Sequence, residues 1–96
     1  MKSVEFAGFL KQIRQQKEIP QRIVAARLDI DTSTLSKIEL GERQVSIAMI
    51  KGLAEVLNID FKELQIRYIT EKILKDFEGQ EFLTDALKIT LKRITS

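Results

Sequence analysis

The stretch that most constrains the fold runs from Pro20 to Gly41, with the sequence PQRIVAARLDIDTSTLSKIELG. Its apolar residues recur at helical spacing in two groups, Val24, Ala25 and Leu28 in the first half and Leu35 and Ile38 in the second. The small side chain of Ala25 lies where two helix backbones must approach closely. This stretch therefore predicts two short helices that pack on each other through a tight turn.

The residues between the two groups support that turn. Asp29 tolerates a left-handed backbone better than most residues, and Ile30 can fill the corner. Asp31 can accept hydrogen bonds from the backbone at the start of the next helix, and Gly41 can end that helix. The sequence thus predicts a helix-turn-helix.

Residues 6 to 64 resemble the lambda-repressor-like DNA-binding domain, the XRE and Cro type of bacterial and phage regulators. The matching residues are Arg14, Gln21, Ala25, Leu28, Ile30, the run from Ser33 to Glu39, Gly41 and Arg43. The resemblance implies an all-α domain of five helices. It also implies that the second helix of the motif enters the major groove of DNA, and that the protein acts as a dimer.

Three residues depart from the family pattern. Pro20 stands where a capping Ser or Thr is common, and Asp29 replaces the glycine that the family prefers in the turn. Ile23 occupies a position that is usually polar. It is either an isolated exposed residue or a contact for the C-terminal part of the chain.

The predicted recognition helix runs from about Thr32 to Leu40. Its outward positions, which are expected to contact bases, are Thr32, Ser33, Ser36 and Lys37. Family correspondence puts Thr32, Ser33 and Lys37 at base-contacting positions, with Ser36 beside them. Lysine can donate to the O6 and N7 atoms of guanine, whereas Ser and Thr hydroxyls discriminate poorly. We therefore expect a guanine preference opposite Lys37, although a solvated helix face would show the same polar pattern.

Other residues match positions that contact DNA phosphates or support the motif in relatives. Gln21, Arg43 and Gln44 are expected to contact phosphates, which position the protein without reading sequence. The resemblance also implies an ion pair between Arg14 and Glu39. Two unrelated surface charges are the alternative.

Three further helices complete the expected core. Ser3 and Ser46 are expected to cap the helices that begin near them, and Gly52 is expected to mark a close helix contact. Asn58 is expected to end a helix in the left-handed conformation. Asp60 to Glu63 has the form of a capping box for the next helix.

The family pattern does not extend beyond Leu64, so the rest of the chain is interpreted from its apolar periodicity alone. A helix is expected to continue unbroken from Phe61 to Glu78, and a second amphipathic helix is expected from Gln80 to Ile94. We expect residues 1–64 to form the DNA-binding domain and 65–96 to form a helical extension. The apolar residues expected to form a dimer interface are Ile66, Ile69, Ile73, Phe77, Phe82, Leu83, Leu87 and Leu91. Alternatively, the last helix folds back on its own domain through Ile23 or Tyr68.

Composition excludes several functions. The 96 residues contain no cysteine and no histidine, so disulfides and the usual zinc and acid-base sites are excluded. We therefore expect no enzymatic activity, no cofactor and no metal. Residues 1–58 carry nine Lys and Arg against seven Asp and Glu, and residues 59–96 carry seven of each. The excess of two positive charges thus lies with the motif, which weakly supports nucleic-acid binding.

The sequence predicts a transcriptional regulator, most simply a repressor or autoregulator, that binds an inverted repeat in double-stranded DNA as a homodimer. No apolar run is long enough to span a membrane and no signal peptide is recognisable, so we expect a cytoplasmic, nucleoid-associated protein. One alternative is an antitoxin whose C-terminal helices bind a toxin. Another is a protein-interaction module that has lost DNA binding. RNA polymerase is a further possible protein partner.

Overall fold

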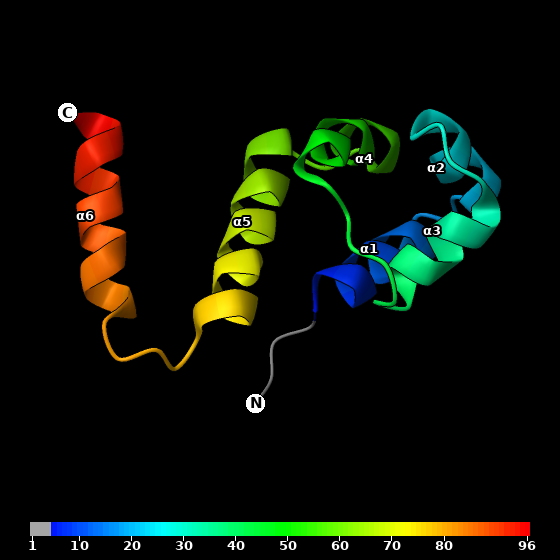
Figure 1. Ribbon diagram of the computed structural model, residues 1–96. Coiled ribbons are helices and arrows are strands. Elements are labelled where there is room, and N and C mark those ends of the chain that lie inside the picture. The colour runs from blue at the N-terminus through cyan, green and yellow to red at the C-terminus, as the bar shows by residue number, and fades with distance from the viewer. Residues whose placement is uncertain (1–4) are drawn as a thin grey trace.

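The computed structural model describes residues 5–96, and within that range the chain is helical with no β-strand (Figure 1). The elements are α1 (Phe6–Gln16), α2 (Gln21–Arg27), α3 (Thr32–Glu39), the 3-10 helix η1 (Ile47–Met49), α4 (Ile50–Leu57), α5 (Phe61–Phe77) and α6 (Leu83–Thr95). The predicted all-α class, with an extended fifth helix and one added helix, is confirmed.

The hydrophobic core lies among α1 to α5. Its fully or nearly buried members are Leu10, Val24, Ala25, Leu35, Ile38, Val45, Ile50, Leu53, Ala54, Leu57, Leu64 and Tyr68. These residues occupy the apolar positions of each helix at the 3.6-residue period, so burial of that face orients the helices. The apolar pattern of the motif predicts four of them, Val24, Ala25, Leu35 and Ile38, whereas Val45 lies in a loop.

Several predicted helix ends are confirmed. Asp29 and Asn58 adopt the left-handed conformation with φ of 57° and 54°. Asp60 accepts a hydrogen bond of 3.0 Å from the Glu63 N–H, which is the forward half of the capping box. Glu18 also has a positive φ, of 56°, which the sequence reading did not anticipate.

One predicted cap differs from the structure, and another lies outside the described residues. Ser46 makes no side-chain cap, because η1 follows it and α4 begins only at Ile50. The expected Ser3 cap lies outside the described residues, and α1 begins at Phe6 with Glu5 in the N-cap position. A tight 3-10 turn at Ile47–Met49 thus replaces the first turn of the expected fourth helix.

Gly52 and Lys17 hold α4 against its neighbours. A Cβ at Gly52 would meet Leu28 Cδ2 at 3.2 Å, so the absent side chain allows α4 to approach the end of α2 closely. Lys17 Nζ donates to the carbonyls of Leu57 and Asn58 at 2.6 and 2.8 Å. Its ammonium therefore satisfies carbonyls that the end of α4 leaves without helical partners.

The expected division after Leu64 falls inside α5. Tyr68, one turn further on, is 8% exposed and belongs to the core. The Phe6 ring meets its edge with a centroid distance of 5.3 Å, and Arg67 lies 4.0 Å above the Phe9 ring. Because α1 packs on this part of α5, the folded unit extends past residue 64.

The last helix stands apart from the core, at the opposite end of the molecule from α2 and α3 (Figure 1). It contains no buried residue and begins at Leu83 rather than at Gln80. Residues 78–82 form turns instead, with Gly79 at a φ of 88°. In this structure α6 does not fold back on its own domain, since Ile23 remains 42% exposed and Tyr68 is covered by the core.

Candidate nucleic-acid interface

The turn between α2 and α3 is held by backbone and side-chain hydrogen bonds. The Ile30 N–H donates to the Ala25 carbonyl at 3.0 Å, which closes the end of α2. Asp31 Oδ1 accepts from the Thr34 N–H at 2.7 Å, so the predicted N-cap of α3 is confirmed. The start of α3 is therefore fixed by its own sequence.

Hydrogen bonds from the Thr34 side chain and backbone lower the pKa of Asp31. The charges of Lys37 and Arg43 lower it further. Both cations thus act on the N-terminal end of α3, although Arg43 lies beyond that helix. The arrangement concentrates positive charge beside the end of the helix that is suited to approach an anion.

A buried polar network links α1, α2 and α3. Arg14 Nε donates to Glu39 Oε2 at 2.6 Å and Arg14 Nη2 to Glu39 Oε1 at 3.0 Å. Glu39 is the only buried charged residue among those described, with 4% of its side chain exposed. Arg14 Nη1 also donates to the Ile19 carbonyl at 3.0 Å. A bidentate pair of this kind sets the rotation of α3 relative to α1.

Gln21 extends this network toward the surface. Its Nε2 donates to Glu39 Oε1 at 3.0 Å, and its Oε1 accepts from the Ser36 hydroxyl at 3.3 Å. Ser36 is therefore half-buried, whereas the sequence reading placed it with the outward side chains. The difference arises because Gln21, at the start of α2, reaches across to α3.

The other three residues assigned to base contacts lie on the open side of α3. Thr32, Ser33 and Lys37 are all exposed. They project from the helix face opposite to Leu35 and Ile38, which are each 1% exposed. The structure thus brings two hydroxyls and one ammonium together on a helix whose other face is anchored in the core.

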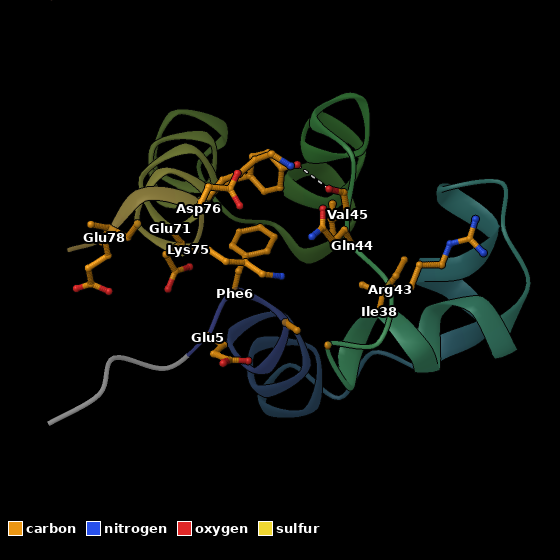
Figure 2. Close-up of a pocket in the computed structure, with 15 residues that line it drawn as sticks. Glu5, Phe6, Ile38, Arg43, Gln44, Val45, Glu71, Lys75, Asp76 and Glu78 are labelled. Atoms are coloured by element: carbon orange, nitrogen blue, oxygen red, sulfur yellow. Dashed lines mark hydrogen bonds between the residues drawn. The ribbon is translucent and has the colours of Figure 1, made fainter. Parts of the chain in front are cut away.

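The segment that follows α3 is fixed at both of its ends. Gly41 has a φ of 79° and reverses the chain, and the Tyr68 hydroxyl donates to the buried Val45 carbonyl at 2.6 Å. Between these two anchors, Arg43 and Gln44 are exposed. Figure 2 shows the Arg43 side chain pointing away from Glu71 and the other labelled residues of α5. Arg43 and Gln44 are therefore presented beside α3 by the packing of this segment on α5.

A groove of about 370 Å³ lies beneath this segment, between the start of α1 and the second half of α5 (Figure 2). Phe6, Val45, Tyr68 and Leu74 contribute apolar surface to it. Glu71 Oε2 is buried there and has no hydrogen-bond partner among residues 5–96. Burial raises the pKa of Glu71, Glu5 raises it further, and Arg67 lowers it.

The sequence reading missed one exposed residue beside the recognition helix. Leu40, the residue after α3, is 63% exposed, more than any other large apolar residue between Glu5 and Leu64. The sequence pattern predicts only that Leu40 ends the recognition helix. Its position out of phase with Leu35 and Ile38 is the signal that could have identified it.

The residues expected to form a dimer interface lie outside the core. Ile73 and Leu83 are half-buried, and the others are exposed, namely Ile66, Ile69, Phe77, Phe82, Leu87 and Leu91. These side chains come from α5, α6 and the turn between them.

No helix within residues 5–96 is both long and apolar enough to cross a membrane.

Comparison with known proteins agrees with this geometry. The helix-turn-helix family matches residues 10–64, which is more than half of the chain and ends within α5. The control protein C.MunI of Mycoplasma sp is 34% identical over 62 residues, covering 64% of this chain and 84% of that protein. No solved structure matches the chain. The chain belongs to the helix-turn-helix family of the XRE type, a family of DNA-binding transcription regulators.

Proposed function

We propose that this protein is a sequence-specific transcriptional regulator that binds an inverted repeat as a homodimer and represses or autoregulates transcription. The observation that carries the proposal is the exposed set of Thr32, Ser33 and Lys37 on α3, a helix whose rotation is set by the buried Arg14–Glu39 pair. A helix held this way can enter a major groove without losing its orientation.

In this proposal the base edges are contacted from α3. Lys37 donates to guanine, and the hydroxyls of Thr32 and Ser33 pair with neighbouring bases. Ser36 contributes through its half-buried hydroxyl, which already donates to Gln21 and can still accept. Leu40 lies at the edge of the same surface, where an apolar side chain can contact a thymine methyl group.

The phosphates on either side are contacted by Gln21, Arg43 and Gln44. Gln21 uses one N–H of its amide for Glu39, and the second N–H is free to donate to a phosphate. Arg43 supplies a charge-assisted hydrogen bond from the segment after α3. These contacts set register and affinity, whereas those from α3 set sequence preference.

The homodimer would place two recognition helices about 34 Å apart, one turn of the duplex, on a two-fold symmetric site. The similarity to a protein named as a control protein supports a regulatory role. The exposed apolar residues of α5 and α6 support assembly with a second chain.

Two alanine variants test the division of roles. After a preferred duplex has been selected from a random pool, Lys37→Ala should relax base preference at one position per half-site by about 1 to 3 kcal/mol. Arg43→Ala should weaken all duplexes alike and flatten the salt dependence of binding. Both effects are measured by titrating duplexes that differ at single positions, at several salt concentrations.

Lys51→Ala is the matched control, because Lys51 is an exposed lysine on α4 outside the proposed interface. It should leave both affinity and preference unchanged. A uniform loss of affinity in both the Lys37 and Arg43 variants would contradict the assigned roles. Failure of the parent protein to shift any duplex at low salt would contradict DNA binding itself.

A further inference from the structure

The exposed apolar side chains of this molecule are concentrated in its C-terminal third. Among the residues that the structure describes, thirteen large hydrophobic side chains are exposed, and nine of them lie between Ile66 and Ile94. The helix α6 has an apolar face but no buried residue. Since nothing within residues 5–96 buries this face, the face is available to another chain.

The helix α5 has two apolar faces. Leu64 and Tyr68 lie in the core, whereas Ile66, Ile69 and Phe77 are exposed at positions about half a turn away around the helix. A surface helix of a monomer needs only one apolar stripe. The second stripe, formed by Ile66, Ile69, Ile73 and Phe77, is here called the outer stripe of α5.

The spacing of the outer stripe matches that of α6 read in the opposite direction. The stripe follows the steps +3, +4, +4 along α5, and Ile94, Leu91, Leu87 and Leu83 follow the steps −3, −4, −4 along α6. An antiparallel pairing therefore places Ile66 opposite Ile94, Ile69 opposite Leu91, Ile73 opposite Leu87, and Phe77 opposite Leu83. Each step is the spacing that keeps side chains on one helix face.

Within one chain the side chains of these pairs are largely exposed. Ile69 is 43% exposed, Leu91 62% and Ile94 76%. Residues 78–82 connect α5 to α6, and α6 stands apart from α5 (Figure 1).

The exposed area is the amount that a stable dimer needs. Seven side chains of this set and the adjoining turn are 42 to 76% exposed, namely Ile66, Ile69, Phe77, Phe82, Leu87, Leu91 and Ile94. Together they present about 700 Å² of apolar surface per chain, close to the ≈ 800 Å² per partner of a standard interface. An isolated exposed residue would not require a partner, but seven large apolar side chains exposed on two successive helices and the turn between them indicate one.

We propose that two copies of this chain exchange their last helices, so that α6 of each copy lies antiparallel on the outer stripe of α5 of the other. The exchange rests on the proposed homodimer and specifies how its two chains interlock. By two-fold symmetry both pairings form at once, and α5, α6 and their partner copies make a four-helix bundle. The pairing leaves Lys88 and Lys92 on the solvent side of α6.

Engineered disulfides test this pairing, because the natural chain has no cysteine. The full-length variant I69C/L91C, oxidised mildly, should migrate on a non-reducing gel at twice the mass of one chain. A mixture of the single variants I69C and L91C should give the same linked dimer, whereas each single variant alone should give little. The matched control I69C/K92C should not link, because residue 92 points away from the stripe.

Four results would overturn the proposal. The first is a disulfide of I69C/L91C that closes within one chain. The second is a linked dimer formed by L91C alone as readily as by the mixture, and the third is equal linking of I69C/K92C. The fourth is a monomer of the natural chain in sedimentation. A second pair, I73C/L87C, gives an independent reading if the first variant is misfolded by circular dichroism.

Sedimentation and DNA titration of the natural chain separate this proposal from the proposed function. A dimer that shifts its duplex but closes its disulfide internally would overturn only the helix exchange. A monomeric chain would overturn the homodimer as well.

Discussion

Single residues decide how the recognition helix is held. Arg14 and Glu39 come from helices that are distant in sequence, and their bidentate contact is covered on nearly all sides, with 12% and 4% of the side chains exposed. Arg27 and Glu55 form a second ion pair in which about half of each side chain is exposed. The two pairs have the same chemistry in different environments, so burial determines how much each pair affects the free energy of unfolding.

Replacing Arg14 by alanine should lower the free energy of unfolding by about 3 to 5 kcal/mol, because the Glu39 carboxylate would remain buried without a positive charge beside it. Arg27→Ala, the control, should change it by less than about 1 kcal/mol, since both groups of that pair are solvated. Urea denaturation followed by circular dichroism measures both. Equal losses in the two variants would show that burial of the Arg14–Glu39 pair is not what matters.

Glu71 should make stability depend on pH. Its pKa is raised above the ordinary value of 4.5 by burial, so the folded state retains this proton when the unfolded chain has released it. Stability from this group is therefore present below pH 4.5 and is lost as pH rises through the folded-state pKa. Glu71→Gln should raise the free energy of unfolding by about 1 kcal/mol at pH 7, and by less at pH 4.

Denaturation of the Glu71→Gln variant at both pH values checks this expectation. Asp76→Asn, which removes an exposed carboxylate from the same groove, should shift stability by less than about 0.5 kcal/mol. A Glu71→Gln variant that is less stable than the parent at pH 7 would mean that the carboxylate has a favourable partner.

At the scale of elements, the unit of recognition is α2, the turn and α3 together. Asp31 caps α3 from its own sequence, and Asp29 supplies the left-handed residue that turns the chain between the helices. Gly41 ends the unit, and Tyr68 of α5 holds the following segment through Val45. Residues of the unit itself thus fix the turn and the start of α3, whereas tertiary packing on α5 fixes the segment after α3.

The left-handed conformation of Asp29, with a φ of 57°, sets the stability of the turn. Asp29→Ala should lower the free energy of unfolding by about 1 kcal/mol, because alanine lacks the local hydrogen bonding that lets aspartate tolerate this region. Asp29→Gly should be at least as stable as the parent protein. Ala26→Gly, at an exposed position inside α2, should instead cost about 1 kcal/mol.

Chemical denaturation of these three variants at one pH gives the comparison. If Asp29→Gly were destabilised as much as Ala26→Gly, the backbone conformation would not explain why a glycine is typical at this position.

At the scale of the whole molecule, the folded unit α1 to α5 carries the proposed DNA surface, and α6 lies outside the core of that unit. The helix α5 connects the DNA surface to the proposed dimer interface, because one of its faces packs in the core and the other carries the outer stripe. Any change in the position of α5 therefore affects both Val45, beside the DNA surface, and the proposed dimer interface.

A chain shortened to residues 1–78 should fold, because it keeps Tyr68 and all of α5. It should sediment as a monomer and bind its duplex about 100-fold more weakly or worse, since the two half-sites would then be bound independently. Sedimentation equilibrium and duplex titration measure these two properties. An unchanged dimer would contradict the role proposed for α6.

Sequence alone determined the features that depend on neighbours within a few residues. The two helices and turn from Pro20 to Gly41, the cap at Asp31 and the left-handed residues Asp29 and Asn58 follow from side-chain period and local hydrogen bonding. The family resemblance supplied the expectation that Arg14 and Glu39 meet, a contact between residues 25 positions apart.

Only the tertiary structure decided the features that depend on distant segments. Ser36 is half-buried because Gln21 reaches it from another helix, and Tyr68 joins the core because Val45 and Phe6 cover it. A 3-10 turn replaces the expected start of α4, and no residue of α6 is buried by the described part of the chain. Periodicity shows that a helix has an apolar face, but the surface that covers that face is set by how all the elements pack.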